Sequence, residues 1–204
     1  GWHIECSAMS ARYLGDYSDI HCGGKDHIPI HHTNEIAQTE ASKGTRLANF
    51  WVHGYFLQMK DSKMSKSSGD FVRLETLMEK GYPPLVFRYF CLQAHYRSEL
   101  SFTWASLKAA DTRLMRLYEG AYSWGPPSEI SEKYYNRFVQ HLYNDLNLPR
   151  ALAIAWELVR SGEPDGVKKA TLLAFDEIFG LDIEGWMPEK VEIPDEITGL
   201  LAKR

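Results

Sequence analysis

The sequence predicts an α/β segment followed by an all-α segment. Up to residue 60, short apolar runs alternate with stretches of helical character, which is typical of α/β structure. Beyond a stretch rich in serine and lysine, apolar residues recur at helical spacing. A Gly-Pro-Pro run at 125–127 then indicates a linker, because proline continues neither a helix nor a central strand. We therefore expect three domains, at 1–60, 61–125 and 126–204.

The first segment predicts three elements. DIHCGGKD, residues 19–26, has the pattern of a short strand that runs into a glycine turn. Residues 31–43 predict a helix that ends at Gly44, since glycine is favoured just after the last helical residue. Residues 51–59 predict a further strand.

The rest of the chain predicts helices. Apolar residues at helical spacing occupy 74–81, 83–96 and 103–124. Three amphipathic helices follow at 131–146, 148–160 and 166–180, separated by Asn147 and by a turn around 162–166. A small helical bundle is the simplest packing for these last three.

Composition restricts the class of protein. Of 204 residues, 44% are hydrophobic and 25% charged, which is enough to build a core. A net charge of -4 argues against a generally basic nucleic-acid-binding surface, although local basic patches remain open. No apolar run approaches the ~20 residues of a membrane span, so we expect a cytoplasmic protein without a membrane partner. Three widely spaced cysteines favour reduced thiols or a metal site over disulfides.

A polar loop at 60–71 carries two lysines suited to a polyphosphate. Lys63 and Lys66 stand among four serines, including Ser65 and Ser67. Ammonium groups beside hydroxyl donors can neutralise the charge that develops during phosphate chemistry. A solvated surface turn is the alternative interpretation.

Three residues offer a set of metal ligands. Cys6, His31 and Glu35 provide sulfur, nitrogen and oxygen, and an i, i+4 spacing places the last two on one helical face. His32 is left unassigned, because neighbours on a helix point about 100° apart and it should not share the metal with His31. Judged alone, Cys6 is as well explained as a small buried hydrophobe.

The motifs together resemble the cysteinyl-tRNA synthetases. KMSKS, residues 63–67, is identical to the signature loop of class I aminoacyl-tRNA synthetases, and GWHIECSAMS and CGGKDHIPIHHTNEIAQTE precede it in the family's order. The resemblance implies the C-terminal half of a Rossmann-like catalytic domain, then the KMSKS loop with connecting helices, then a helical bundle that contacts the tRNA stem.

The resemblance also implies roles for individual residues. Cys6, His31 and Glu35 would bind Zn²⁺, with a fourth protein ligand, a cysteine, outside this chain. Trp2 would line the cysteine pocket. The remaining expected contacts are with ATP: Gly24, Asp26 (ribose), Lys63, Ser65, Lys66 and Ser67, with Trp51 and His53 as possible neighbours of the adenosine.

The implied reaction has two steps. ATP, with Mg²⁺, activates the carboxylate of L-cysteine and releases pyrophosphate; the terminal ribose of tRNA(Cys) then attacks the adenylate. Lys63 and Lys66 would be the catalytic residues, and a monomeric full-length enzyme is expected.

Departures from the family pattern limit what this chain is expected to do. Cys22 stands where glycine is common and Thr33 where glutamate is common. No His-x-Gly-His motif occurs, so we expect a piece that lacks the N-terminal half of the catalytic domain and the C-terminal anticodon-binding region. Such a chain should be inactive alone and should expose a sheet edge.

Two other functions remain open: one transfers cysteine to a different acceptor, and the other involves no catalysis. A cysteine ligase of mycothiol biosynthesis would share the zinc and lysine motifs but transfer cysteine to an amino sugar. A truncated, non-catalytic paralogue would keep only zinc or RNA binding. The joint presence of Cys6, His31, Glu35 and Lys66 argues against the paralogue.

Overall fold

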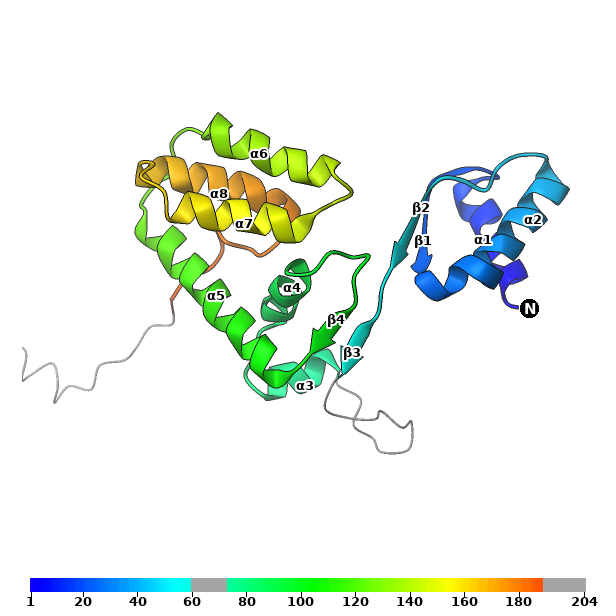
Figure 1. Ribbon diagram of the computed structural model, residues 1–204, viewed down its shortest axis with the longest axis horizontal. Helices are drawn as coiled ribbons and strands as arrows, with labels where there is room; N and C mark the ends of the chain where they lie inside the picture. The colour runs from blue at the N-terminus through cyan, green and yellow to red at the C-terminus, as the bar shows by residue number, and fades with distance from the viewer. Residues whose placement is uncertain (60–72, 189–204) are drawn as a thin grey trace, which may run out of the picture.

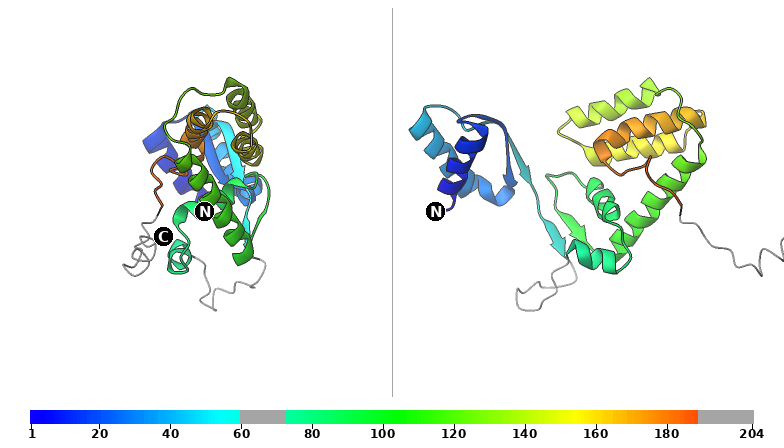
Figure 2. Two further views of the ribbon diagram at one scale, coloured as in Figure 1. Left: turned by 90° about the vertical axis from the view of Figure 1, so that its left-hand side faces the viewer. Right: turned by 180° about the vertical axis from the view of Figure 1, so that it is seen from behind.

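The computed structural model describes residues 1–59 and 73–188. Figures 1 and 2 show two lobes joined by an extended segment. We call residues 1–54 the N-terminal lobe and residues 73–188 the C-terminal lobe. The α/β segment followed by helices that the sequence predicts is confirmed.

The N-terminal lobe is built on one βαβ unit. Strands β1 and β2 pair in parallel, with Ser18 opposite Ala48 and Gly24 opposite Gly54. The chain crosses between them through α2, which packs against α1 (Figure 1). The elements of this lobe are α1 (His3–Leu14), β1 (Ser18–Gly24), η1 (Lys25–His27), η2 (Ile28–His32), α2 (Thr33–Lys43) and β2 (Ala48–Gly54).

The helix predicted at 31–43 differs from the observed helix at its start and agrees with it at its end. Regular α-helix begins at Thr33, because Ile28–His32 forms a single π-helical turn, the wide turn that often accompanies functional sites. The helix ends at Gly44, whose left-handed backbone (φ 68°) lets its N–H bond the carbonyl of Glu40 at 3.0 Å.

The predicted strand at 51–59 is divided into two. After β2 the chain leaves the first sheet at Tyr55, whose N–H bonds the carbonyl of Tyr96 at 2.8 Å. Strand β3 (Leu57–Met59) then pairs in parallel with β4 (Leu100–Phe102). Residues 55–59 therefore connect the lobes. The prediction of a single strand at 51–59 was wrong, because its first part pairs with β1 and its last part with β4.

The C-terminal lobe consists of the predicted helices and strand β4, which the sequence did not predict. A reciprocal capping box between Thr103 and Ser106 fixes the start of α5. The helices are α3 (Leu74–Glu79), α4 (Pro84–Leu92), α5 (Trp104–Ser123), α6 (Glu132–Tyr143), α7 (Leu148–Val159) and α8 (Asp165–Phe179).

One hydrophobic core runs through the C-terminal lobe. It begins at Leu77 on α3 and extends to Ile183 after α8, and it includes buried residues of α4 and α5 as well as of the three bundle helices. The bundle therefore packs on the connecting helices across the linker at 125–127. The predicted domain limits at 60 and 125 stay predictions.

No helix within residues 1–59 and 73–188 combines the length and the apolar character that crossing a membrane requires.

Candidate active site

Three residues from three elements meet in the N-terminal lobe. Cys6 lies on α1, His31 on η2 and Glu35 in the first turn of α2. Their ligand atoms all lie within 4.8 Å of one another. Glu35 is fully buried and His31 is 7% exposed. The structure thus brings together the predicted set of ligands.

Two neighbouring histidines lie close to one carboxylate. His31 Nε2 lies 3.6 Å and His32 Nε2 3.8 Å from the same Glu35 oxygen, Oε2. His32 was left unassigned at the Cys6 site, and it is absent from the group formed by Cys6, His31 and Glu35. Both rings approach Glu35 because residues three and four positions apart on a helix are neighbours.

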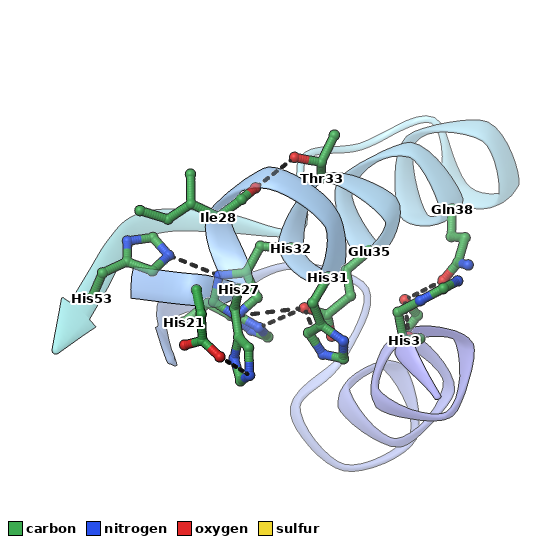
Figure 3. Close-up of polar contacts among 12 residues, drawn as sticks. His3, His21, His27, Ile28, His31, His32, Thr33, Glu35, Gln38 and His53 are labelled. Atoms are coloured by element: carbon green, nitrogen blue, oxygen red, sulfur yellow. Dashed lines mark hydrogen bonds and ion pairs between the residues drawn. The ribbon is translucent and has the colours of Figure 1, made fainter. Parts of the chain in front are cut away.

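A second group of possible ligands shares the same carboxylate. His21 in the middle of β1 places Nε2 3.0 Å from Glu35 Oε2, and the ligand atoms of His21, His32 and Glu35 also lie within 4.8 Å of one another. His32 Nδ1 in turn lies 2.8 Å from His53 Nε2 on β2. Figure 3 shows these rings gathered around Glu35.

Two buried polar atoms of this cluster have no hydrogen-bond partner in the described part of the chain. They are His31 Nδ1 and Glu35 Oε1. Buried polar atoms are nearly always paired in folded proteins, and an unpaired carboxylate oxygen is costly. Cys6, His31 and Glu35 supply the sulfur, nitrogen and oxygen donors of zinc sites, so the residues present fit a zinc ion.

The electrostatics favour the neutral form of His32 and His53. Burial, together with the neighbouring His21, His53, His27 and His31, lowers the pKa of His32 to about 4. The pKa of His53 is also lowered, mainly by burial. Neutral imidazole is the form that binds metals and that both donates and accepts hydrogen bonds.

The thiol of Cys6 is held protonated by its surroundings. Burial raises its pKa, and the carboxylates of Glu35 and Glu5 raise it further. A cation beside it would reverse this effect, since metal ligation deprotonates a thiol.

A cavity of about 270 Å³ opens beside these residues. Trp2 forms one wall, with its ring 3.9 Å from that of His31. Cys22 also lines the cavity, although it is absent from both ligand groups. The volume lies just below the range of about 300–1,000 Å³ for drug-sized ligands and suits a small substrate.

The predicted glycine turn is not a turn: Gly23 and Gly24 are the last two residues of β1, where they pair with His53 and Gly54 and pack closely. A side chain on Gly23 would meet the His32 ring at 2.6 Å, and one on Gly24 would collide with the carboxylate of Asp26. Asp26 lies in η1, past the carboxyl end of β1, where ligands of parallel sheets bind. The structure thus places Gly24 and Asp26, the two residues predicted to contact ATP here, beside one another.

The predicted lysine loop lies outside the described residues. This applies to Lys63, Ser65, Lys66 and Ser67. Of the two aromatic neighbours, Trp51 packs on the ring of His21 at 4.8 Å, and His53 bonds His32. Sequence reasoning left His21 out altogether; its only signal was a histidine one residue before the turn CGG.

Comparison with known proteins shows which family the chain resembles. Residues 1–112 match the family model described as "tRNA synthetases class I (C) catalytic domain". A relative from Burkholderia lata, "Cysteine--tRNA ligase 1", is 55% identical over 205 residues, which is 100% of this chain and 44% of that protein. "Cysteine--tRNA ligase" of Borrelia hermsii is 38% identical over 226 residues, 100% of this chain and 47% of that protein.

Among solved structures, Mycobacterium tuberculosis methionyl-tRNA synthetase bound by methionyl-adenylate has a TM-score of 0.50 at 18% identity. The match covers 80% of this chain and 40% of that one. At that identity it supports the fold alone. The chain spans about half the length of the curated relatives it matches.

Proposed function

The chain belongs to the class I (C) tRNA synthetase family, and we propose that it contributes to an enzyme that activates L-cysteine with ATP and transfers it to tRNA(Cys). The observation that carries the proposal is the convergence of Cys6, His31 and Glu35 beside a small cavity. The names of the curated relatives agree with a cysteine substrate. A cytoplasmic location would follow from a tRNA substrate.

Selection of the amino acid is assigned to the proposed zinc site. Cys6, His31 and Glu35 would hold Zn²⁺, with a fourth protein ligand from outside this chain. When bound, zinc supplies a soft cation that prefers a thiolate to an alcohol, which separates cysteine from serine. Trp2 would close the side of the pocket and exclude water from it.

The second group of residues would keep the pocket rigid. His21 bonds Glu35, and His32 bonds His53, so the carboxylate and both rings are oriented before a substrate enters. Preorganised groups of this kind lose little entropy on binding. The neutral His32 also leaves the pocket without an extra positive charge.

ATP would bind beyond the carboxyl end of β1. Gly24 would allow close approach of the nucleotide, and Asp26 would accept the ribose hydroxyls. Lys63 and Lys66, with Ser65 and Ser67, would stabilise the phosphate charge together with Mg²⁺ as the cysteine carboxylate attacks and pyrophosphate leaves. The ribose hydroxyl of tRNA would then attack the adenylate.

The test is amino-acid selection by the complete synthetase. ATP–pyrophosphate exchange is measured with cysteine and with serine for the wild type, Cys6→Ser and the matched variant Cys22→Ser. We expect Cys6→Ser to reduce the preference for cysteine by about 100-fold, the scale of a lost metal contact, and Cys22→Ser to keep it. An unchanged preference in Cys6→Ser would sink the proposal.

The isolated chain of 204 residues should show no exchange activity, because it lacks a His-x-Gly-His motif. Cysteine-dependent exchange by this chain alone would refute that expectation.

A further inference from the structure

The three residues of η1 contact three different parts of the molecule. His27 lines the cavity of the candidate active site. Asp26, predicted to bind the ribose of ATP, lies beside Gly24. The ammonium group of Lys25 lies against residues 55–59, the segment that connects the lobes (Figure 1). Lys25 therefore links the predicted ATP site to the connecting segment.

The ammonium group of Lys25 has three partners. Its Nζ lies 3.2 Å from Glu99 Oε1. It also lies 4.1 Å from the centre of the Tyr55 ring and 5.6 Å from that of the Phe56 ring. A cation within about 6 Å of a ring centre is attracted to the face of that ring. One carboxylate and two aromatic rings thus hold this side chain in place.

Glu99 belongs to a loop that is itself held firmly. The second oxygen of its carboxylate accepts a hydrogen bond from the side-chain amide of Gln58 at 2.8 Å. Two backbone hydrogen bonds tie the loop to the connecting segment on either side of Glu99: Tyr55 N–H to the carbonyl of Tyr96 (2.8 Å) and Leu100 N–H to the carbonyl of Phe56 (3.2 Å). Lys25 therefore meets a carboxylate whose position is already fixed.

The pair with Glu99 keeps the charge of Lys25 away from Asp26. The two residues are adjacent in sequence and opposite in charge, so an unpaired Lys25 could neutralise the Asp26 carboxylate. Within residues 1–59 and 73–188, the one ion-pair contact of that carboxylate is His27 Nε2, at 3.9 Å. The Asp26 side chain is 56% exposed, so its oxygens can accept hydrogen bonds from a ligand.

We propose that Lys25 is a positioning residue, whose contacts with Glu99 and Tyr55 hold η1 so that Asp26 faces the ribose of ATP. The inference rests on the proposed function, from which it takes ATP and the role of Asp26. A single 3₁₀ turn has few and poorly aligned hydrogen bonds of its own, so contacts of its first residue restrict its orientation. A carboxylate oriented in advance loses less entropy when the ligand binds.

A surface ion pair without any functional role is the alternative, and the two interpretations predict different results. The side chains of Lys25 and Glu99 are 32% and 46% exposed. Ion pairs as exposed as this contribute little to stability. The alternative therefore predicts no effect on ATP, whereas a positioning role predicts a loss that requires the ribose hydroxyls.

The experiment measures ATP–pyrophosphate exchange by the complete synthetase with ATP and with dideoxy-ATP, which lacks both ribose hydroxyls. Lys25→Met should lower kcat/KM for ATP about tenfold, less than the ~100-fold cost of a displacement of about 1 Å. It should leave KM for cysteine and kcat/KM for dideoxy-ATP unchanged, because neither involves the ribose hydroxyls. Lys25→Arg keeps a cation for Glu99 and for the aromatic rings, so it should restore most of the loss.

The matched control is Lys43→Met in the same lobe. Lys43 Nζ lies 3.0 Å from Asp16 Oδ1, and the two side chains are 44% and 49% exposed. This variant should exchange with both nucleotides as the wild type does. The melting temperature of Lys25→Met should lie within about 2 °C of the wild-type value, as expected for an exposed pair.

Equal losses with the two nucleotides would overturn the proposal, since Lys25 would then act on the phosphates or on the fold. An unchanged kcat/KM for ATP in Lys25→Met, or a larger fall in its melting temperature, would overturn it too. If exchange with dideoxy-ATP is too slow to measure, the double variant Lys25→Met/Asp26→Asn decides. It should lose no more than Asp26→Asn alone, and additive losses would refute the link between the two residues.

The outcome is separable from that of the amino-acid test. If Lys25→Met shows the loss that requires the ribose hydroxyls while Cys6→Ser keeps the preference for cysteine, the positioning role stands and the proposed selection of cysteine falls. If Cys6→Ser loses the preference but Lys25→Met exchanges as the wild type does, only the positioning role falls.

Discussion

The N-terminal lobe buries histidine and glutamate side chains, whereas the C-terminal lobe buries mainly aliphatic and aromatic ones. In the first lobe the buried side chains are His31, His32, Glu35 and Thr39, joined by Leu47 and Ala48. In the second lobe, among the residues described, Thr171 is the one buried polar residue. The N-terminal lobe also exposes large apolar side chains: Trp2, Ile4, Met9, Tyr13, Leu14, Tyr17, Ile20, Ile28, Ile30 and Phe50.

The two lobes are therefore stabilised in different ways. Apolar burial stabilises the C-terminal lobe without any ligand. The N-terminal lobe keeps a buried carboxylate oxygen and an imidazole nitrogen without partners, which costs free energy until a ligand satisfies them. Its stability should therefore depend on what it binds.

The largest expected effect is in the core of the C-terminal lobe. Phe175 is fully buried and stacks on Phe138 with ring centroids 4.1 Å apart. Phe175→Ala should lower the free energy of unfolding of this lobe by about 3–5 kcal/mol, because it leaves a cavity. Urea denaturation followed by circular dichroism measures the change.

The matched control is Ile178→Ala on the same helix, where the side chain is 47% exposed. It should change stability by less than about 0.5 kcal/mol. Zinc affinity should stay the same in both variants. A loss of zinc affinity in Phe175→Ala would break the comparison, since it would make the two lobes one cooperative unit.

The second effect concerns the buried carboxylate of the N-terminal lobe. Glu35→Gln should weaken zinc binding about 100-fold or more, because it removes a charged ligand that also orients His21. Competition with a chromophoric chelator gives the affinity. The control is Glu40→Gln, which changes an exposed residue of α2 and should bind zinc as the wild type does. Equal zinc affinities for the wild type, Glu35→Gln and Glu40→Gln would contradict the assignment of Glu35 as a ligand.

The smallest effect is a pH dependence in the C-terminal lobe. Burial raises the pKa of the Tyr118 phenol, and the carboxylates of Asp176 and Asp182 raise it further. The hydroxyl donates to the carbonyl of Leu181. Because the folded-state pKa exceeds the unfolded value of about 10, the protonated phenol stabilises the fold below pH 10, and this contribution is lost as the pH rises above it.

Tyr118→Phe should therefore cost about 1 kcal/mol at neutral pH and flatten the alkaline decline in stability. The decline should not vanish, since burial also raises the pKa of Tyr89. Tyr122→Phe, at a position that is 55% exposed, should keep the wild-type slope. Chemical denaturation at a series of alkaline pH values measures these slopes; a wild-type slope in Tyr118→Phe would refute the role given to its burial.

Local sequence patterns predicted most of the fold. The three amphipathic helices α6, α7 and α8 were clear because their apolar stripes are strong. Strand β4 was missed because it has three residues and exists through pairing with β3, about forty positions earlier in the chain. Pairing between distant segments leaves little trace in a local pattern.

The candidate site was predicted in part. The spacing of His31 and Glu35 suggested a common face, but only the resemblance to a family linked Cys6 to them. His32 was left unassigned, although its position three residues before Glu35 places it beside that carboxylate on a helix. The role of His21 requires the parallel strands to be placed against α2, which sequence alone does not give.

The most direct test of the metal centre uses cobalt(II) in place of zinc with the 204-residue chain. A thiolate ligand gives cobalt a charge-transfer absorption in the near ultraviolet. We expect one metal per chain, a charge-transfer band in the wild type and in Cys22→Ser, and no band in Cys6→Ser. A band that survives in Cys6→Ser, or that disappears in Cys22→Ser, would contradict the centre formed by Cys6, His31 and Glu35.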